Sequence, residues 1–172
     1  GINSDDFMRA SNISSSLASL WLSKVDFELK EEIILPALLQ EIGKFILSDL
    51  IVSENKTELF KSKVASGCSI EEVERELFGF TTSEITSKIF RYWKLSENLI
   101  SMIEFVDNIE KASDEYKKKT QILDVIKTAC QVSAPLSDSN VEKAIEKANK
   151  YGLDTKILKK AIEILQDRLL DE

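Results

Sequence analysis

Hydrophobic positions near the start of the chain predict an amphipathic helix over residues 5–21. Apolar side chains recur there at steps of three and four residues, which is the spacing of one helix face: Phe7, Ala10, Ile13, Leu17, Leu20 and Trp21. Asp5 and Asp6 stand just before this stripe and are suited to cap the first turn. The pattern therefore predicts a helix with one buried face.

The next apolar segment, residues 28–52, leaves little room for a polar face. A helix that is apolar on most sides is normally buried, so this segment is predicted to form the central helix. Pro36 is expected to kink it or to lie in its first turn, because proline lacks an N–H and crowds the preceding carbonyl group. Gly43 costs about 1 kcal/mol relative to Ala inside a helix. Close approach of a neighbouring helix would account for that glycine.

Polar residues after position 53 predict several short helices joined by turns. One apolar pattern stops at Gly67, and both Ser69–Glu72 and Thr81–Glu84 have the residue order of a capping box. Ser96 is placed to cap a further short helix. No strand pattern lies between these starts, so the chain is predicted to be all-α.

Three more helices are predicted toward the end of the chain. The first covers residues 116–132, the second starts at Asp138 or Ser139 and closes at Gly152, and Asp154 caps the last. With only 5 Gly and 2 Pro in 172 residues, few breakers interrupt these helices.

Four aromatic side chains fall at helix-core spacing, and we predict that they pack inside the fold. They are Trp21, Phe45, Phe90 and Trp93. The exception is the Phe78-Gly79-Phe80 turn, where two aromatic side chains cluster at a loop. This turn is the candidate interaction surface, and packing at a helix junction is the alternative interpretation.

Charge and hydropathy exclude several kinds of partner. The chain carries 30 acidic and 23 basic residues, for a net charge of −7, so it would repel a nucleic-acid backbone. No apolar run reaches 18 residues, so no membrane span is predicted.

Cys68 and Cys130 lack metal-type spacing and are expected to be reduced thiols in a cytoplasmic protein. Because the chain begins with Gly1 rather than Met, we expect a fragment that lacks an upstream part of the fold.

The chain contains no histidine. That absence excludes Ser-His-Asp and Cys-His catalysis as well as any imidazole metal ligand. No Gly-rich phosphate-binding loop is present either. Neighbouring carboxylates such as Glu71 and Glu72 fit solvated helix faces, so no cofactor and no metal site are predicted.

Two motifs in the correct order resemble HDOD domains. The segment 35–47, LPALLQEIGKFIL, is similar to the family's central helix, which typically reads L-A-G-L-L-H-D-I-G-K-L. The segment 74–93, ERELFGFTTSEITSKIFRYW, resembles the family's E-x-E-x-x-G-x-x-H signature and its continuation to a tryptophan. Phe7–Ser11 looks like the start of the preceding helix, F-W-x-H-S. The resemblance implies a compact HD-like bundle over residues 1–112, with residues 113–172 as a C-terminal helical extension packed on it.

HDOD domains are relatives of the HD phosphohydrolases, in which histidines and a His-Asp pair hold catalytic metal ions. Carried over to this chain, the first histidine becomes Ala10, the His-Asp pair becomes Gln40-Glu41, and a third histidine becomes Thr82. Further histidine positions fall within Glu104 to Asp107, and a later aspartate position falls near Cys130. The resemblance therefore implies a metal site whose ligands have been replaced. Glu41 is expected to pair with Lys44 or with a backbone group.

We therefore expect a non-catalytic bacterial signalling domain that acts by contact with a partner protein or a small ligand. Its contact surface would be the Phe78–Thr82 turn together with the mouth of the lost metal site near Gln40 and Thr82. The alternative is a residual metal-dependent phosphohydrolase acting on a nucleotide or a cyclic dinucleotide. A third possibility is a structural adaptor whose recognition lies upstream.

Overall fold

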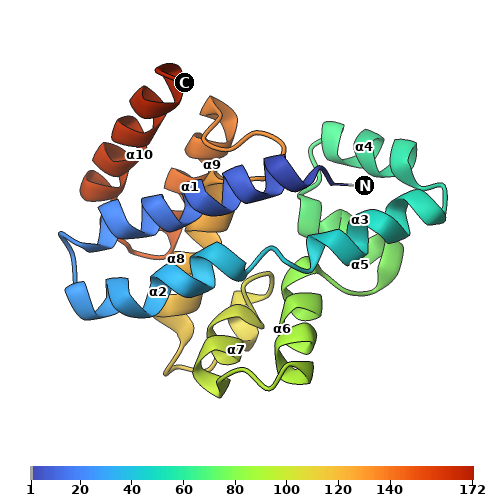
Figure 1. The fold of residues 1–172 in the computed structure, drawn as a ribbon, viewed down its shortest axis with the longest axis horizontal. Helices are drawn as coiled ribbons and strands as arrows, with labels where there is room; N and C mark the ends of the chain where they lie inside the picture. Colours follow the sequence, from blue (N-terminus) through green and yellow to red (C-terminus); the bar gives the residue numbers. More distant parts are fainter. Residues whose placement is uncertain (1) are drawn as a thin grey trace.

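The computed structural model describes residues 2–172, and helices are the only regular elements in that range (Figure 1). They are α1 Ser4–Leu22, α2 Phe27–Leu39, α3 Lys44–Ser53, α4 Thr57–Ala65, α5 Ile70–Phe78, α6 Thr82–Tyr92, α7 Glu97–Ile103, the 3-10 helix η1 Ile109–Lys111, α8 Lys117–Ala129, α9 Asp138–Lys150 and α10 Thr155–Leu170. The prediction of an all-α, multi-helix bundle is confirmed. No helix within residues 2–172 is both long enough and apolar enough to cross a membrane.

Side-chain caps fix where most helices begin. Ser69 and Glu72 form the predicted capping box of α5, and the Ser96 hydroxyl accepts a hydrogen bond from the backbone at the start of α7. At α1 the predicted caps, Asp5 and Asp6, are wrong by two and three residues. Asn3 is the cap, and its side-chain oxygen accepts from the N–H groups of the two aspartates predicted for that role.

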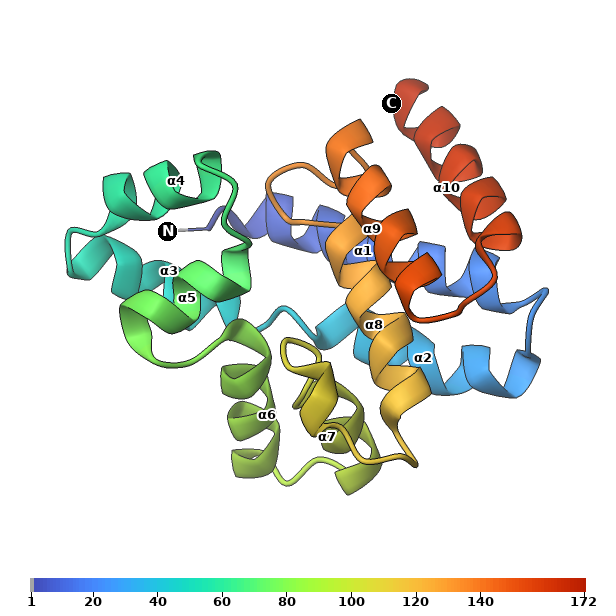
Figure 2. The same cartoon turned by 180° about the vertical axis from the view of Figure 1, so that it is seen from behind.

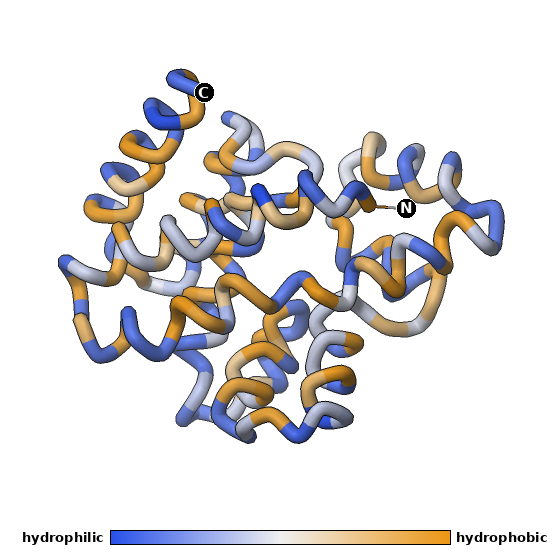
Figure 3. The backbone as a smooth tube through the Cα atoms, in the orientation of Figure 1, coloured by the Kyte–Doolittle hydropathy of each residue, from blue (hydrophilic) through white to orange (hydrophobic). Residues whose placement is uncertain are grey.

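The centre of the molecule is α8. Helices α1, α2, α7 and α9 pack on it, and α10 packs on α1 and α9. Figure 2 shows α8 in the middle with α9 and α2 beside it. Every residue from 122 to 129 is buried because helices surround this segment. Apolar and polar positions alternate along the chain, as expected of amphipathic helices around a shared core (Figure 3).

The buried apolar cluster includes side chains of α1, α2, α7, α8, α9 and α10, together with Phe90 of α6. It therefore takes members from both sides of the boundary predicted after residue 112. The division into 1–112 and 113–172 stays a prediction.

Segment 28–52 is not the single central helix predicted for it. It forms α2 and α3, separated by a turn at residues 40–43. Pro36 lies inside α2, and α3 buries only Lys44 and Leu47 while Ile46 and Val52 are each about half exposed. The apolar composition of α3 misled the prediction because much of its apolar surface faces outward.

The turn between α2 and α3 is closed by a residue far away in sequence. The Thr86 hydroxyl of α6 accepts from the Gly43 N–H at 2.9 Å and lies 2.9 Å from the Gln40 carbonyl oxygen. A Cβ on Gly43 would lie 2.5 Å from the Thr82 carbonyl oxygen. The prediction that Gly43 permits close approach of a neighbouring helix is confirmed.

Helices α3, α4 and α5 form a lobe at one side of the molecule, called the α3–α5 lobe below (Figure 1). None of its side chains belongs to the buried apolar cluster, and α4 has no buried residue. Two of the few buried side chains in the lobe, Lys44 and Glu74, are charged. Polar contacts therefore have a large share in attaching this lobe to the rest of the fold.

Candidate functional site

Five charged side chains meet where the α3–α5 lobe joins the core, and we call them the charged cluster. They are Glu41 from the α2–α3 turn, Lys44 from α3, Glu74 from α5, Asp107 from the segment after α7, and Lys127 from α8. Each side chain is at most 11% exposed. Elements far apart in sequence thus bring three carboxylates and two ammonium groups together inside the protein.

The two lysines alternate with the carboxylates. The Lys44 Nζ lies 3.4 Å from a Glu41 oxygen and 3.7 Å from a Glu74 oxygen. The Lys127 Nζ lies 3.6 Å from the other Glu41 oxygen and donates a hydrogen bond to Asp107. Glu41 therefore bridges the two ammonium groups. Its expected pairing with Lys44 is one half of this bridge.

The start of α6 holds the other two carboxylates. Glu74 accepts from the Thr82 N–H at 3.0 Å and from the Thr82 hydroxyl at 2.7 Å. Asp107 accepts from the Ser83 N–H at 3.1 Å. The first N–H groups of a helix have no partner within the helix and carry partial positive charge. These two carboxylates therefore accept hydrogen bonds from the unpaired N–H groups at the N-terminus of α6 and stabilise it.

The opposite charges of the cluster stabilise one another's ionised forms at neutral pH. Burial alone would raise the pKa of Asp107, but attraction to Lys127 and hydrogen bonds from Lys127 and Ser83 hold that pKa well below its usual range. Burial alone would lower the pKa of Lys127, and Asp107 and Glu41 outweigh it, so the pKa lies well above the ordinary value. The pKa of Lys44 is raised because Glu41 and Glu74 outweigh its burial. Both lysines are therefore ammonium ions beside an ionised Asp107.

The structure brings some of the predicted metal-site positions together. Gln40, Glu41 and Thr82 meet at the cluster, and the Gln40 amide nitrogen donates to the Leu123 carbonyl oxygen at 3.2 Å. Gln40 and Thr82 are almost completely buried, so neither side chain is available at the surface where the mouth was expected. Ala10 is buried in α1 and offers only a methyl group.

Of the later positions, only Asp107 reaches the cluster. Glu104 instead accepts two hydrogen bonds from Arg91, at 2.9 and 2.8 Å, near the surface. Cys130 is buried away from solvent, and its burial raises the pKa of the thiol to about 12. The residue of α8 that enters the cluster is Lys127, nearly one turn earlier.

Sequence reasoning anticipated Lys44 as a partner of Glu41 but missed Glu74 and Lys127 as members of the same site. A signal for Lys127 was present, since it is a lysine within the apolar run of α8, where a charged side chain needs a buried partner. The identity of that partner depended on the tertiary fold.

The family assignment follows from a sequence comparison. The model of the HDOD domain matches residues 1–109, which include the charged cluster except for Lys127. The chain belongs to the HDOD domain family. No protein of curated function gives a significant sequence match.

Two solved structures resemble this HDOD protein in fold. One is a virulence factor of Campylobacter jejuni subsp. jejuni, with 21% identity over 94% of this chain and a TM-score of 0.69. The other is from Shewanella amazonensis SB2B, is provisionally described as a phosphohydrolase, and has 21% identity over 94% of this chain with a TM-score of 0.59. This chain spans 62% and 57% of the lengths of these two proteins.

The HDOD charged cluster does not fit the metal site of HD phosphohydrolases. Across residues 2–172, no three Cys, Asp or Glu side chains are grouped so that they could hold a metal ion. Lys44 and Lys127 supply positive charge among the carboxylates, where an HD enzyme would supply it with metal. A divalent ion placed about 4 Å from one ammonium group would be repelled by on the order of 8 kcal/mol at an effective dielectric constant of about 20.

The Phe78-Gly79-Phe80 turn of the HDOD domain closes α5. Gly79 has φ 81°, and its N–H donates to the Arg75 carbonyl oxygen at 2.9 Å. The two phenylalanine rings stack with centroids 6.4 Å apart, and the Lys56 ammonium lies 4.9 Å from the Phe78 centroid. Both rings are half-buried. The role of this turn as an interaction surface stays a prediction.

A second aromatic surface was not predicted. Trp93 was expected in the core but is 56% exposed, and the neighbouring Tyr92 is 84% exposed. Both line an apolar groove between α3 and α6 with Phe45 and Ile46. Trp21 and Phe90 are buried as predicted. Trp93 lies outside the core because α6 ends at this residue, and its ring stacks on the ring of Phe90.

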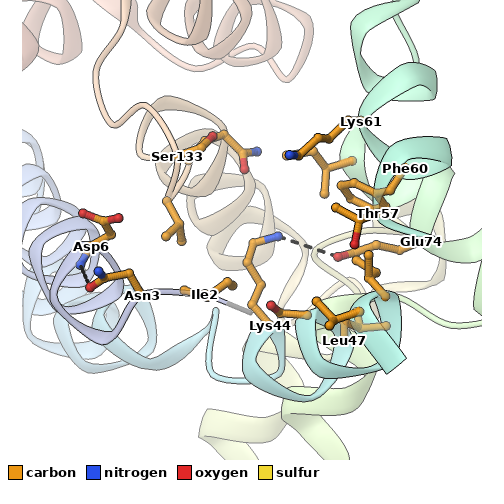
Figure 4. Close-up of a pocket in the computed structure, with 16 residues that line it drawn as sticks. Ile2, Asn3, Asp6, Lys44, Leu47, Thr57, Phe60, Lys61, Glu74 and Ser133 are labelled. Carbon is orange, nitrogen blue, oxygen red and sulfur yellow. Dashed lines mark hydrogen bonds and ion pairs between the residues drawn. The ribbon is translucent and has the colours of Figure 1, made fainter. Parts of the chain in front are cut away.

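A cavity of about 440 Å³ opens beside the charged cluster, between the start of α1, the α3–α5 lobe and the end of α8. Lys44 and Glu74 belong both to its lining and to the cluster (Figure 4). The cavity therefore opens on the Lys44–Glu74 side of the cluster, and neither Gln40 nor Thr82 lines it.

Proposed function

We propose that this HDOD protein is a non-catalytic signalling domain that acts by contact with a partner protein or a small ligand in the bacterial cytoplasm. The observation that supports the proposal most strongly is the pair of ammonium groups of Lys44 and Lys127 within the buried carboxylates. HD-type hydrolysis needs metal ions that activate water and stabilise charge on phosphorus. Lysine provides positive charge but has no coordination positions for water or phosphate.

The retained carboxylates favour one alternative, a residual metal-dependent phosphohydrolase. Glu41, Glu74 and Asp107 are hard oxygen ligands of the type that Mg²⁺ and Mn²⁺ prefer. For them to bind a metal, Lys44 and Lys127 would have to leave the cluster or lose their protons. The raised pKa of each lysine opposes that change.

Hydrolysis assays separate the two functions. With Mn²⁺ or Mg²⁺ present, we expect purified protein to hydrolyse nucleoside triphosphates and cyclic dinucleotides no faster than buffer, because the water-activating metal has no site. Product formation would be measured by chromatography. Saturable, metal-dependent hydrolysis that Glu41→Ala abolishes would contradict the proposal, and Glu54→Ala on the surface is the matched control.

A further inference from the structure

The cavity beside the charged cluster has the size and lining of a small-molecule site. Its volume of about 440 Å³ lies within the range of roughly 300–1,000 Å³ that is usual for ligand pockets. Its wall is mainly apolar and includes Leu47, Ile51, Val52, Phe60, Ile70 and Val132. A ligand that fills this cavity would therefore bury an apolar body.

One buried ammonium group faces this apolar space with unused hydrogen-bonding capacity. Lys44 is only 7% exposed, and its Nζ reaches from α3 into the cavity (Figure 4). Its contacts with Glu41 and Glu74, at 3.4 and 3.7 Å, are longer than a good N–H···O hydrogen bond. The Glu41 oxygens have no hydrogen-bond partner within residues 2–172. The Lys44 ammonium can therefore donate to an additional acceptor.

A second ammonium group reaches the same space from the opposite wall. Lys61 projects from α4, and Figure 4 shows its amine directed toward the region above the Lys44 amine. Lys61 forms no ion pair with any of the residues 2–172. An anionic group in the cavity would face both lysines, and pairing with Lys61 would break no existing ion pair.

The lining also holds two carboxylates, and one of them, Glu74, is paired with Lys44 at 3.7 Å. Glu74 is turned toward Thr82, which donates two hydrogen bonds to it. Asp6 lies beside Asn3 at the far side of the cavity from Lys61 (Figure 4). The positive charge in the lining that has no ion-pair partner within residues 2–172 is therefore that of Lys61, next to the apolar wall.

From these features we propose that the cavity binds a small amphipathic monocarboxylate, with its head between Lys44 and Lys61 and its hydrocarbon body against α3 and α4. A single negative charge matches the site, since the protein has a net charge of −7 and would repel a polyanion. Such a ligand would connect the α3–α5 lobe to the end of α8. The inference deepens the proposed function, on which its role as a signal rests.

Decanoate, below its micelle-forming concentration, is a suitable probe. In a titration followed by amide NMR, we expect decanoate to shift Leu47, Phe60 and Val132, which line the cavity. Decanol has the same body without the charge and should bind about tenfold more weakly, equivalent to about 1.4 kcal/mol. Decyltrimethylammonium, with the opposite charge, should bind no better than decanol.

Two variants test the role of the head group. Lys61→Met should weaken decanoate binding about five- to tenfold and leave decanol binding unchanged, since the variant removes one ammonium group from the rim. Lys159→Met, an exposed lysine of α10, is the matched control and should bind decanoate like the natural protein. Equal affinity for decanoate and decanol, shifts outside the cavity, or no effect of Lys61→Met would overturn the inference. Each of these results is independent of the hydrolysis assay, which tests the proposed function.

Discussion

Replacing Lys127 by methionine should lower the free energy of unfolding by about 3–5 kcal/mol, because it leaves buried carboxylates without their counter-ion. Lys127 is the hydrogen-bond partner of Asp107 and also lies 3.6 Å from Glu41. Methionine has a similar length and would fill the space of the lysine side chain, so the loss would come from the charge. Urea denaturation followed by circular dichroism at pH 7 would measure it.

Neutralising both partners separates the charge from the packing. In the double variant Lys127→Met with Asp107→Asn, we expect a substantial part of the lost stability to return, since the nearest carboxylate is no longer an uncompensated ion. Lys159→Met on the surface should change the free energy of unfolding by less than about 0.5 kcal/mol. A loss below about 1 kcal/mol for Lys127→Met would show that the cluster does not depend on this ammonium group.

Gly43→Ala should lower the free energy of unfolding by about 3 kcal/mol, the second largest effect among the proposed variants. The new Cβ would lie 2.5 Å from the Thr82 carbonyl oxygen and 2.8 Å from the Thr86 hydroxyl. The first contact is with backbone, so α3 and α6 would have to move apart and disturb the start of α6 that holds Glu74 and Asp107. Thermal and urea unfolding would measure the effect.

Gly152→Ala provides a control for that variant. Gly152 has φ 73°, and a Cβ there would meet nothing within 4 Å, so the expected cost of about 1–2 kcal/mol comes from backbone strain alone. Adding Thr86→Ser to Gly43→Ala should not restore stability, since the contact with the Thr82 carbonyl oxygen remains. If Gly43→Ala were as stable as the natural protein, the close approach of α3 and α6 would be wrong.

Local signals in the sequence were sufficient to predict most helices. Ser69 with Glu72, and Ser96, predicted helix starts because a cap depends only on residues within one turn. The break between α2 and α3 could not be predicted in this way. It depends on Thr86, which lies 43 residues after Gly43 and supplies the hydrogen bonds of the turn. The apolar pattern there continued without interruption.

The charged cluster was partly predictable for a similar reason. The motif around Gln40 and Glu41 and the position of Thr82 led to the prediction that a metal site had been lost there. The cluster also depends on Lys127, which lies 86 residues after Glu41, and on the orientation of Glu74 toward α6. Contacts between such distant positions follow from tertiary packing, which no local pattern encodes.

The proposed loss of the metal would require a compensating change within this HDOD fold. The α3–α5 lobe adds nothing to the buried apolar cluster and meets the core at the charged cluster. Removing the metal without compensation would have left Glu41, Glu74 and Asp107 in mutual repulsion inside the protein. We therefore infer that Lys44 and Lys127 are the compensation that keeps the lobe attached.

The most direct test of this account is the melting temperature of the purified protein in EDTA and in increasing concentrations of MnCl₂. A metal that binds the folded state must raise stability as its concentration exceeds the dissociation constant, by about 2.7 kcal/mol at one hundred times that constant. If lysine ammonium groups supply the positive charge of the cluster, the melting temperature will be the same in EDTA and in MnCl₂. A melting temperature that falls in EDTA and rises progressively with Mn²⁺ would contradict the account.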